Sequence, residues 1–580
     1  MLDLELRRSL ESEVSRDRLM SVTEGIARWV RLSGTQEEMS AVEYVRSLLD
    51  GYGLETELIF HDAYISLPGP ASLMTVEGEE LACITHSFSI STGPDGIEFD
   101  LCDCGQGTPA ELASARGKAA LIEGLAMSGL VRGVEAQGAA AQVWVNGERT
   151  HEMIVSTVWG SPGRGRVGLL PKGPVVSVTD EVGRRLRERL QRGEPRIRIR
   201  TEVDTRWRKT PILVADLRMP GSQDFVLFSG HIDSWHLGAM DNGGANATMV
   251  EVSRIFSAHR DRLRRGLRVA FWSGHSHGRY AGSAWYADNR WRELRRHCVA
   301  HVNIDSVGGR GATVLSEGIA MASTRELGAQ VIGEVAGAGF HGARVGRSGD
   351  QSFVGLGVPS LWMSLSEQPP YDHPTARAFS SLVGESRSGG LGWWWHSTED
   401  TVDKLDPDFL LRDARIYVGA LTRLLAEPLL PLSTAAEAAD LEQLLAGLEK
   451  AAAERFDLSG VVGLAGRVAA RCRELDAWRS ARQGQEIPEA AARTFNHALH
   501  ETLQRLVSVN YSASGPFDHD PAAGVPAIPL LDPVRELASL EPASDEARFL
   551  CVDLTRARNR VEHALERALE RVEAGLEALQ

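Results

Sequence analysis

The chain has 580 residues and a net charge of −15, with 43% hydrophobic and 24% charged residues. That length exceeds what one hydrophobic core supports, so several domains are expected. No run approaches the roughly 18 apolar residues of a membrane span, and the acidic balance argues against nucleic acid as the main partner.

The first residues, Met1 to Arg8, are charged and periodic, and they lack the apolar core and small-residue cleavage site of an export signal. Six cysteines are scattered along the chain without a C-x-x-C pair. Cys102 and Cys104 are separated by a single residue, which strains a direct disulfide, and two thiols alone are a weak soft-metal site. We therefore expect a reduced, cytoplasmic protein.

The first clear element is a helix over residues 35–50. Thr35 can cap it and Glu38 completes a capping box, while Gly51 and Gly53 end it. These signals place a helix early in the first structural unit.

A second unit is predicted between residues 77 and 204. It follows a Pro/Gly-containing stretch at 67–72, and its short apolar runs alternate with glycine turns. The runs lie at 119–122, 141–145 and 175–178. We predict a small β-rich inserted domain without a catalytic cluster.

From about residue 211 the pattern alternates between strand and helix. Continuous apolar runs, typical of strands buried on both faces, lie at 225–228, 267–272, 299–304 and 360–364. Helical patterns separate them at 245–258, 283–295 and 324–336. This alternation predicts an α/β fold with a mostly parallel central sheet flanked by helices, formed by residues 1–76 and 205–430.

Residues 431–580 are predicted to form a helical domain. Its last helix begins near Ala547 and carries a long apolar stripe that includes Val561, Leu565 and Val572. Packing against its own chain and burial in a subunit interface both explain such a stripe.

Candidate ligands lie just past the carboxyl ends of the predicted strands, where ligands of α/β sheets collect. They are His231, His275, His277 and Asp305. Imidazole and carboxylate groups from separate loops are what a divalent metal site requires. Each residue alone is explained as a core histidine or a helix cap, but their order together favours a metal site.

Three further residues fit the same chemistry. Asp233 can accept the second ring N–H of a histidine and fix its tautomer. Asp241 lies in Met-Asp-Asn-Gly-Gly, where the glycines allow close approach and the carboxylate can bridge two ions. His396 follows Trp393-Trp-Trp, whose rings can wall a pocket.

Together these motifs resemble the di-zinc aminopeptidase and glutamate carboxypeptidase family, which also includes the non-catalytic transferrin receptors. The matching segments are 229–236 with 241–244, 272–274 with 282–283, 303–308, 348–353 with 357–360, and 396–401. The resemblance covers nearly the whole chain. It implies a protease-associated insert at 77–204 and a dimerisation-like helical domain at 431–580, and hence a homodimer formed through that domain.

The resemblance also implies a ligand set. His231 and Asp305 would hold one metal, Asp241 would bridge, and His396 would hold the second. Zinc is the first expectation, and a nitrogen-richer site also suits iron, manganese, nickel or copper.

The chain departs from the family at the turn that should carry an acidic pair, one residue as general base and one as ligand. His275-Ser-His277 stands there instead. Alignment forward from Trp272 puts His275 at the base and Ser276 at the ligand, whereas counting back from Gly282 puts Ser276 at the base and His277 at the ligand. We favour His277 as a ligand of the second metal, with His275 as a candidate to join it.

The expected function is a metallohydrolase that cleaves an amide or related C–N bond of a short peptide or small molecule. A metal-activated water would attack, and His275 or Glu399 would move the proton. Two alternatives remain open: a metalloenzyme of other chemistry on a small nitrogen compound, and a non-catalytic receptor-like protein. Arg347 is a candidate partner of a substrate carboxylate, although a surface role is the simpler explanation of it.

Overall fold

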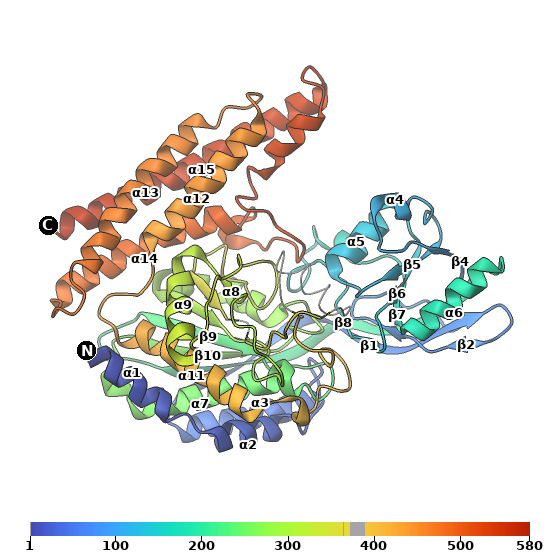
Figure 1. Cartoon of the computed structure of the whole chain (residues 1–580), viewed down its shortest axis with the longest axis horizontal. Coiled ribbons are helices and arrows are strands. Elements are labelled where there is room, and N and C mark those ends of the chain that lie inside the picture. The colour runs from blue at the N-terminus through green and yellow to red at the C-terminus, as the bar shows by residue number, and fades with distance from the viewer. Residues whose placement is uncertain (1, 364, 372–388) are drawn as a thin grey trace.

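The computed structural model describes residues 2–363, 365–371 and 389–580. Figure 1 shows a central sheet with helices on both faces, a smaller lobe that contains β4 to β7, and a helical bundle that contains the C-terminus. The predicted α/β class is confirmed. Ser364, the last residue of the strand predicted at 360–364, lies outside the described residues.

The core of the sheet consists of four parallel strands between two antiparallel neighbours. In spatial order they are β12 (Ile319–Ala320), β13 (Ser360–Trp362), β11 (Cys298–Asn303), β9 (Phe225–His231), β10 (Gly266–Trp272) and β8 (Arg196–Leu217). Every residue of β9, β10 and β11 is buried, because helices cover both faces. The carboxyl ends of these three strands therefore meet at one edge.

The helices of this domain pack on the sheet through apolar stripes. They are α1 (Leu2–Ser12), α2 (Arg16–Ile26), α3 (Gln36–Gly51), α7 (Ala245–Ala258), α8 (Ala281–His297), α9 (Ala322–Ala336) and α11 (Pro407–Ala426). The Thr35 side chain caps α3 as predicted, but the buried Glu38 carboxylate accepts the Gly34 amide rather than that of Thr35. Glu38 thereby ties the residue before the cap to the helix.

The inserted lobe is joined to the main domain by one long antiparallel pair, β1 (Glu55–Thr75) and β8, which runs through both sheets. Its other strands are β2 (Glu80–Leu81), β3 (Ile84–Thr85), β4 (Ile97–Asp103), β5 (Ala119–Glu123), β6 (Ala141–Val145) and β7 (Val175–Val178). Its helices are α4 (Pro109–Leu112), α5 (Ser128–Ala136) and α6 (Asp180–Gln191). Strands β4 to β7 run parallel, so the lobe is itself more α/β than the predicted β-rich unit, and the boundaries at 77 and 204 stay a prediction.

The C-terminal bundle is made of four long helices, α12 (Thr434–Ala452), α13 (Ser459–Ser480), α14 (Glu489–Tyr511) and α15 (Asp545–Ala578). The stripe of α15 that includes Val561, Leu565 and Val572 is buried within the chain, where α15 packs on α13 and α14. Packing within one chain thus accounts for this stripe. No helix in the described part of the chain is long and apolar enough to span a bilayer.

Candidate metal centre

Four predicted ligands meet at the carboxyl edge of the sheet. His231 ends β9, Asp305 follows β11, and Asp241 lies in the turn Ala239–Gly244. His231 Nε2 is 3.0 Å from Asp241 Oδ1 and 3.5 Å from Asp305 Oδ1. The other oxygen of Asp241, Oδ2, is 3.1 Å from His396 Nε2. Asp241 therefore faces one imidazole with each oxygen, as a bridging carboxylate would.

These separations fit a metal centre. Ligand atoms bound at about 2.0–2.2 Å in a tetrahedral arrangement stand about 3.4 Å apart. Although Asp241 Oδ1 is close, no well-aligned hydrogen bond satisfies the buried His231 Nε2. An imidazole lone pair and carboxylate oxygens that converge in this way, without a hydrogen bond, are suited to a divalent cation.

The charge of the centre also favours a cation. Burial alone would lower the pKa of His231, but the charge of Asp305 and contacts with Asp233 and Asp241 raise it well above its usual value. Burial alone would raise the pKa of Asp241, yet His231 and His396 hold it well below the usual range. The buried carboxylates thus stabilise positive charge between them.

Hydrogen bonds orient the two ligand imidazoles. His231 Nδ1 donates to the backbone carbonyl of Asp233 at 2.8 Å, and His396 Nδ1 donates to that of Glu152 at 2.7 Å. Both rings therefore present Nε2 to the centre, which is the usual arrangement around a metal. Glu152 belongs to the inserted lobe, so that lobe fixes one of the ligands.

Asp233 anchors the turn that replaces the acidic pair. Its buried Oδ2 accepts the Ser33 hydroxyl at 2.7 Å and the Ser276 amide at 2.8 Å, and its Oδ1 accepts the His275 amide at 3.3 Å. Burial alone would raise the pKa of Asp233, but His231 and His277 hold it well below the usual range. Its carboxylate thus positions the turn, while its backbone carbonyl positions His231.

His275 lies against the first ligand. Its ring stacks on that of His231 with centroids 3.8 Å apart and planes 14° from parallel, and donor atoms of His231, His275 and Asp305 lie within 4.8 Å of one another. Since a metal lies close to the plane of each imidazole that binds it, two rings stacked face to face 3.8 Å apart are poorly arranged to share one ion. Asp350 Oδ2 accepts the Nδ1–H of His275 at 2.9 Å, which leaves the second ring nitrogen, Nε2, for another partner.

His277 is placed differently. It is fully buried, with Nδ1 3.0 Å from the Ser33 hydroxyl and its ring 4.5 Å from that of Trp235. Its Nε2 has no hydrogen-bond partner, and burial lowers the pKa of the ring. Among the described residues, the compact group of three donors consists of His231, His275 and Asp305, and it contains neither Asp241, His277 nor His396.

Glu399 and Asp400 are neighbours in the sequence, and it is Asp400 that contacts the turn carrying Asp241. Its carboxylate accepts the backbone amides of Met240 and Asp241, each at 2.9 Å. Burial and the charge of Asp241 raise the pKa of Asp400 to about 7. The Glu399 carboxylate makes no hydrogen bond or ion pair with the candidate ligands among the described residues.

Arg31 and Asp350 are further residues that sequence reasoning did not single out. The fully buried Arg31 donates to the carbonyls of Ile232, Leu237 and Gly238 and so holds the loop between His231 and Asp241. Asp350 lies in one of the segments that resemble the family, which is the only signal that would have pointed to it. For Arg31 no sequence signal exists, because its partners are backbone atoms.

The aromatic segment and Arg347 also have definite places. Trp395 stacks on His396 with centroids 3.6 Å apart, whereas Trp394 is buried and directs its Nε1 to Met240.

Arg347 donates hydrogen bonds to Asp520 and to a backbone carbonyl, so its guanidinium is a structural group.

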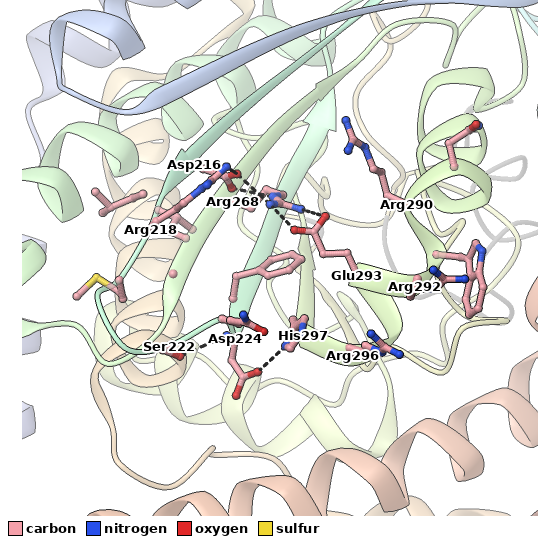
Figure 2. Close-up of a pocket in the computed structure, with 18 residues that line it drawn as sticks. Asp216, Arg218, Ser222, Asp224, Arg268, Arg290, Arg292, Glu293, Arg296 and His297 are labelled. Carbon is pink, nitrogen blue, oxygen red and sulfur yellow. Dashed lines mark hydrogen bonds and ion pairs between the residues drawn. The ribbon is translucent and has the colours of Figure 1, made fainter.

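A separate cavity of about 760 Å³ lies at the opposite edge of the sheet, where β9 and β10 begin and α8 ends. Figure 2 shows that its charged groups largely pair with one another: Arg268 with Asp216 and Glu293, and His297 with Asp224. None of the candidate ligands lines this cavity.

Comparisons with known proteins agree with this geometry. The fold and the converging donors define the class of metallopeptidase-like α/β domains. Residues 213–420 match Peptidase family M28. The predicted family resemblance is confirmed.

The similar proteins cover different parts of the chain. A probable glutamate carboxypeptidase VP8 from Zea mays is 24% identical over 232 residues, which are 38% of this chain and 31% of that protein. The chain thus matches about a third of that relative's length. A Peptidase M28 precursor from Shewanella amazonensis SB2B has a TM-score of 0.57 at 17% identity, over 73% of this chain and 97% of that one. An aminopeptidase from Aneurinibacillus sp. strain AM-1 has a TM-score of 0.52 at 20% identity, over 72% and 96%.

Proposed function

We propose that the protein is a metal-dependent hydrolase that cleaves an amide or related C–N bond. The observation that carries this proposal is the Asp241 carboxylate, which faces His231 with one oxygen and His396 with the other. Asp305 completes the donor set beside His231. The family match to a peptidase supports the same reaction class.

Bound metal ions, with zinc first and iron, manganese, nickel or copper as alternatives, would supply a Lewis acid for the scissile carbonyl and a water of lowered pKa. His231, Asp241, Asp305 and His396 would hold them. Hydrolysis of a short peptide or a related small molecule follows from this chemistry.

His275 is the residue best placed to accept a proton. One of its ring nitrogens lies within 4.8 Å of donor atoms of His231 and Asp305, and Asp350 holds its Nδ1 at 2.9 Å, so that the ring keeps one tautomer and a resulting positive charge is stabilised. This His–Asp pair takes the part that a glutamate has in the family. Glu399, the alternative, has no contact with the candidate ligands among the described residues.

A second candidate function is a metalloenzyme of other chemistry on a small nitrogen compound. The observation in its favour is the turn itself, which offers His275 and His277 where two carboxylates are expected. A nitrogen-rich centre favours metals with redox chemistry more than a carboxylate-rich one does. A receptor-like role without metal is disfavoured by the convergence of His231, Asp241 and His396.

Assembly and location are parts of the same proposal. We propose a homodimer formed through the bundle of α12 to α15, supported by Phe549 and Val552, which are 69% and 49% exposed on α15. A reducing, cytoplasmic location is supported by the six cysteines, all described and all free of disulfides.

The test is metal analysis of the purified protein, followed by assays with aminopeptidase and carboxypeptidase substrates. We expect at least one equivalent of a transition metal and metal-dependent release of an amine. His231→Ala should abolish both, whereas Arg347→Lys, whose side chain pairs with Asp520 and a backbone carbonyl, should abolish neither. Less than a tenth of an equivalent of any transition metal in the wild-type protein would contradict the proposal.

A further inference from the structure

The inserted lobe brings one acidic residue, Glu152, to the candidate ligand His396. The two residues pair through the Glu152 backbone: its amide donates to the His396 carbonyl at 2.8 Å, and its carbonyl accepts His396 Nδ1 at 2.7 Å. These two hydrogen bonds fix the point from which the Glu152 side chain extends. A carboxyl group that is not itself one of the candidate ligands thus lies beside the centre.

This carboxyl group lacks close partners in the protein. Its Oε2 is buried and has no hydrogen-bond partner in the part of the chain that the structure describes. Its Oε1 is 3.9 Å from His236 Nε2, which is beyond hydrogen-bond distance. Burial and the neighbouring His396 and His277 lower the pKa of His236, so that ring is neutral and does not offset a negative charge on Glu152.

Proteins rarely bury a carboxylate in this way, because its lost hydration is normally replaced by an opposite charge or by hydrogen bonds. Burial raises the pKa of Glu152 to about 8, so a proton neutralises the group until a cation takes its place. The Glu152 side chain is 14% exposed and that of His236 is 30% exposed. A solute can therefore reach this pair, and the missing partner can come from outside the protein.

We propose that Glu152, with His236 beside it, binds an ammonium group of the substrate. An ammonium group has three donors and no acceptor, which matches a carboxylate next to a neutral imidazole. A peptide carries this group as its free amino terminus or as a lysine side chain. The inference rests on the proposed function and names its substrate class, because an ammonium group held beside His396 keeps the adjoining amide near the centre.

Glu152→Gln tests this inference, because it removes the charge and keeps the backbone hydrogen bonds to His396. The substrates are leucine p-nitroanilide, its N-acetyl derivative and N-acetyl-lysine p-nitroanilide. We expect the wild-type protein to prefer one of the two that carry an ammonium group over N-acetyl-leucine p-nitroanilide, and that preference identifies the source. In Glu152→Gln the KM for the preferred substrate should rise by about 10- to 100-fold with kcat little changed.

A matched variant and a binding measurement complete the test. Glu148→Gln makes the same chemical change at a side chain of the same lobe that is 86% exposed, and it should leave KM unchanged. Calorimetry then compares isoamylamine with isoamyl alcohol, which has no charge. The amine should bind the wild-type protein at least about 10-fold more tightly, and Glu152→Gln should remove this difference. Circular dichroism and metal content are measured for each variant.

The outcomes separate the inference from the proposed function. Equal KM values in the wild-type protein and Glu152→Gln, or no preference for an ammonium group, would overturn the inference and leave a metallohydrolase intact. Loss of metal in Glu152→Gln would make Glu152 a metal ligand and would also overturn it. If the wild-type protein binds no metal and cleaves none of the substrates, the proposed function fails, and the calorimetry alone decides whether Glu152 binds an ammonium group.

Discussion

Four histidine rings of the site are each held at Nδ1 by an oxygen atom, and each leaves Nε2 available. The oxygens are a backbone carbonyl for His231 and His396, the Asp350 carboxylate for His275, and the Ser33 hydroxyl for His277. Such partners fix the tautomer and the orientation of the ring. The strongest partner, a carboxylate, is given to the ring that we propose as the proton acceptor.

Replacement of Asp350 by asparagine tests this assignment. An amide keeps the size of the side chain but removes the charge that stabilises a protonated His275, so kcat should fall by about 10²-fold or more. The readouts are kcat, KM and metal content, with a pH–rate profile. We expect unchanged metal content and KM together with the lowered kcat; loss of metal together with activity would instead make Asp350 a support of the metal centre.

The convergence of the candidate ligands could be predicted from the sequence, but the residues that support them could not. His231 and Asp305 were recognisable because buried strands precede them, and the α/β pattern brings the ends of such strands to one edge. Asp400 and Arg31 hydrogen-bond to backbone atoms of the segment between His231 and Asp241, which is distant from both in sequence. Contacts to backbone atoms leave no pattern of residue types or spacing in the sequence. The register at His275 and His277 depends on side-chain directions within one turn.

Buried neutral histidines outside the site make stability depend on pH. His86 is fully buried, bonded to Ser177 at 2.8 Å, and burial lowers its pKa to about 3. The unfolded chain binds a proton near pH 6.5 that the folded ring does not, so stability from this residue is present above pH 6.5 and lost as the pH falls toward 3.

His86→Gln isolates this contribution. Between pH 6.5 and 4 the free energy of unfolding of the wild-type protein should fall more steeply than that of the variant, by up to about 1.4 kcal/mol per pH unit. Urea unfolding at several pH values measures the two slopes. Equal slopes would show that His86 is protonated in the folded protein.

At the scale of elements, α15 shows how a periodic stripe becomes a packed interface. Leu565 is buried between α15 and its neighbours, whereas Glu566 beside it is exposed. Leu565→Ala should cost about 2–5 kcal/mol of stability because it leaves a cavity, and Glu566→Ala should change stability by less than about 0.5 kcal/mol. Thermal and urea unfolding of both variants provide the measurement. Equal losses of stability in the two variants would contradict the burial of Leu565 against the neighbouring helices.

Helices with caps and stripes, such as α3 and α15, were predictable because their signals are local. The inserted lobe was harder. Its strands β5, β6 and β7 run parallel, yet their short apolar runs look the same whether neighbouring strands are parallel or antiparallel. Only the crossover α5, between β5 and β6, marks the difference, and its small-residue sequence gave a weak helical pattern.

At the scale of the whole molecule, one side chain at the start of α8 fastens the inserted lobe to the main domain. The Arg279 guanidinium donates to the backbone carbonyls of Ser156 and Ile154 at 3.0 and 3.2 Å. Arg279 follows the turn that contains His275 directly, so this side chain connects the lobe to that turn. Movement of the lobe would therefore act on the turn.

Arg279→Met should loosen this attachment. Without the two donors the carbonyls lose partners at a cost of about 1–3 kcal/mol, and backbone amides near residues 150–160 should exchange faster with deuterium. Arg292→Met, at an exposed position on α8, is the control and should leave exchange unchanged. Identical exchange in the two variants would mean that other contacts hold the lobe.

Glu152 and His396 hydrogen-bond to each other in both directions, and this pair limits how far the protein can be shortened. The Glu152 amide donates to the His396 carbonyl at 2.8 Å, and the His396 ring donates back at 2.7 Å. A truncated protein made from residues 1–76 and 205–430 alone would keep every candidate ligand and yet leave one imidazole free to rotate. A functional fragment must therefore include more than the domain that carries the candidate ligands. If that domain were transferred to another scaffold, the segment that contains Glu152 would have to be included.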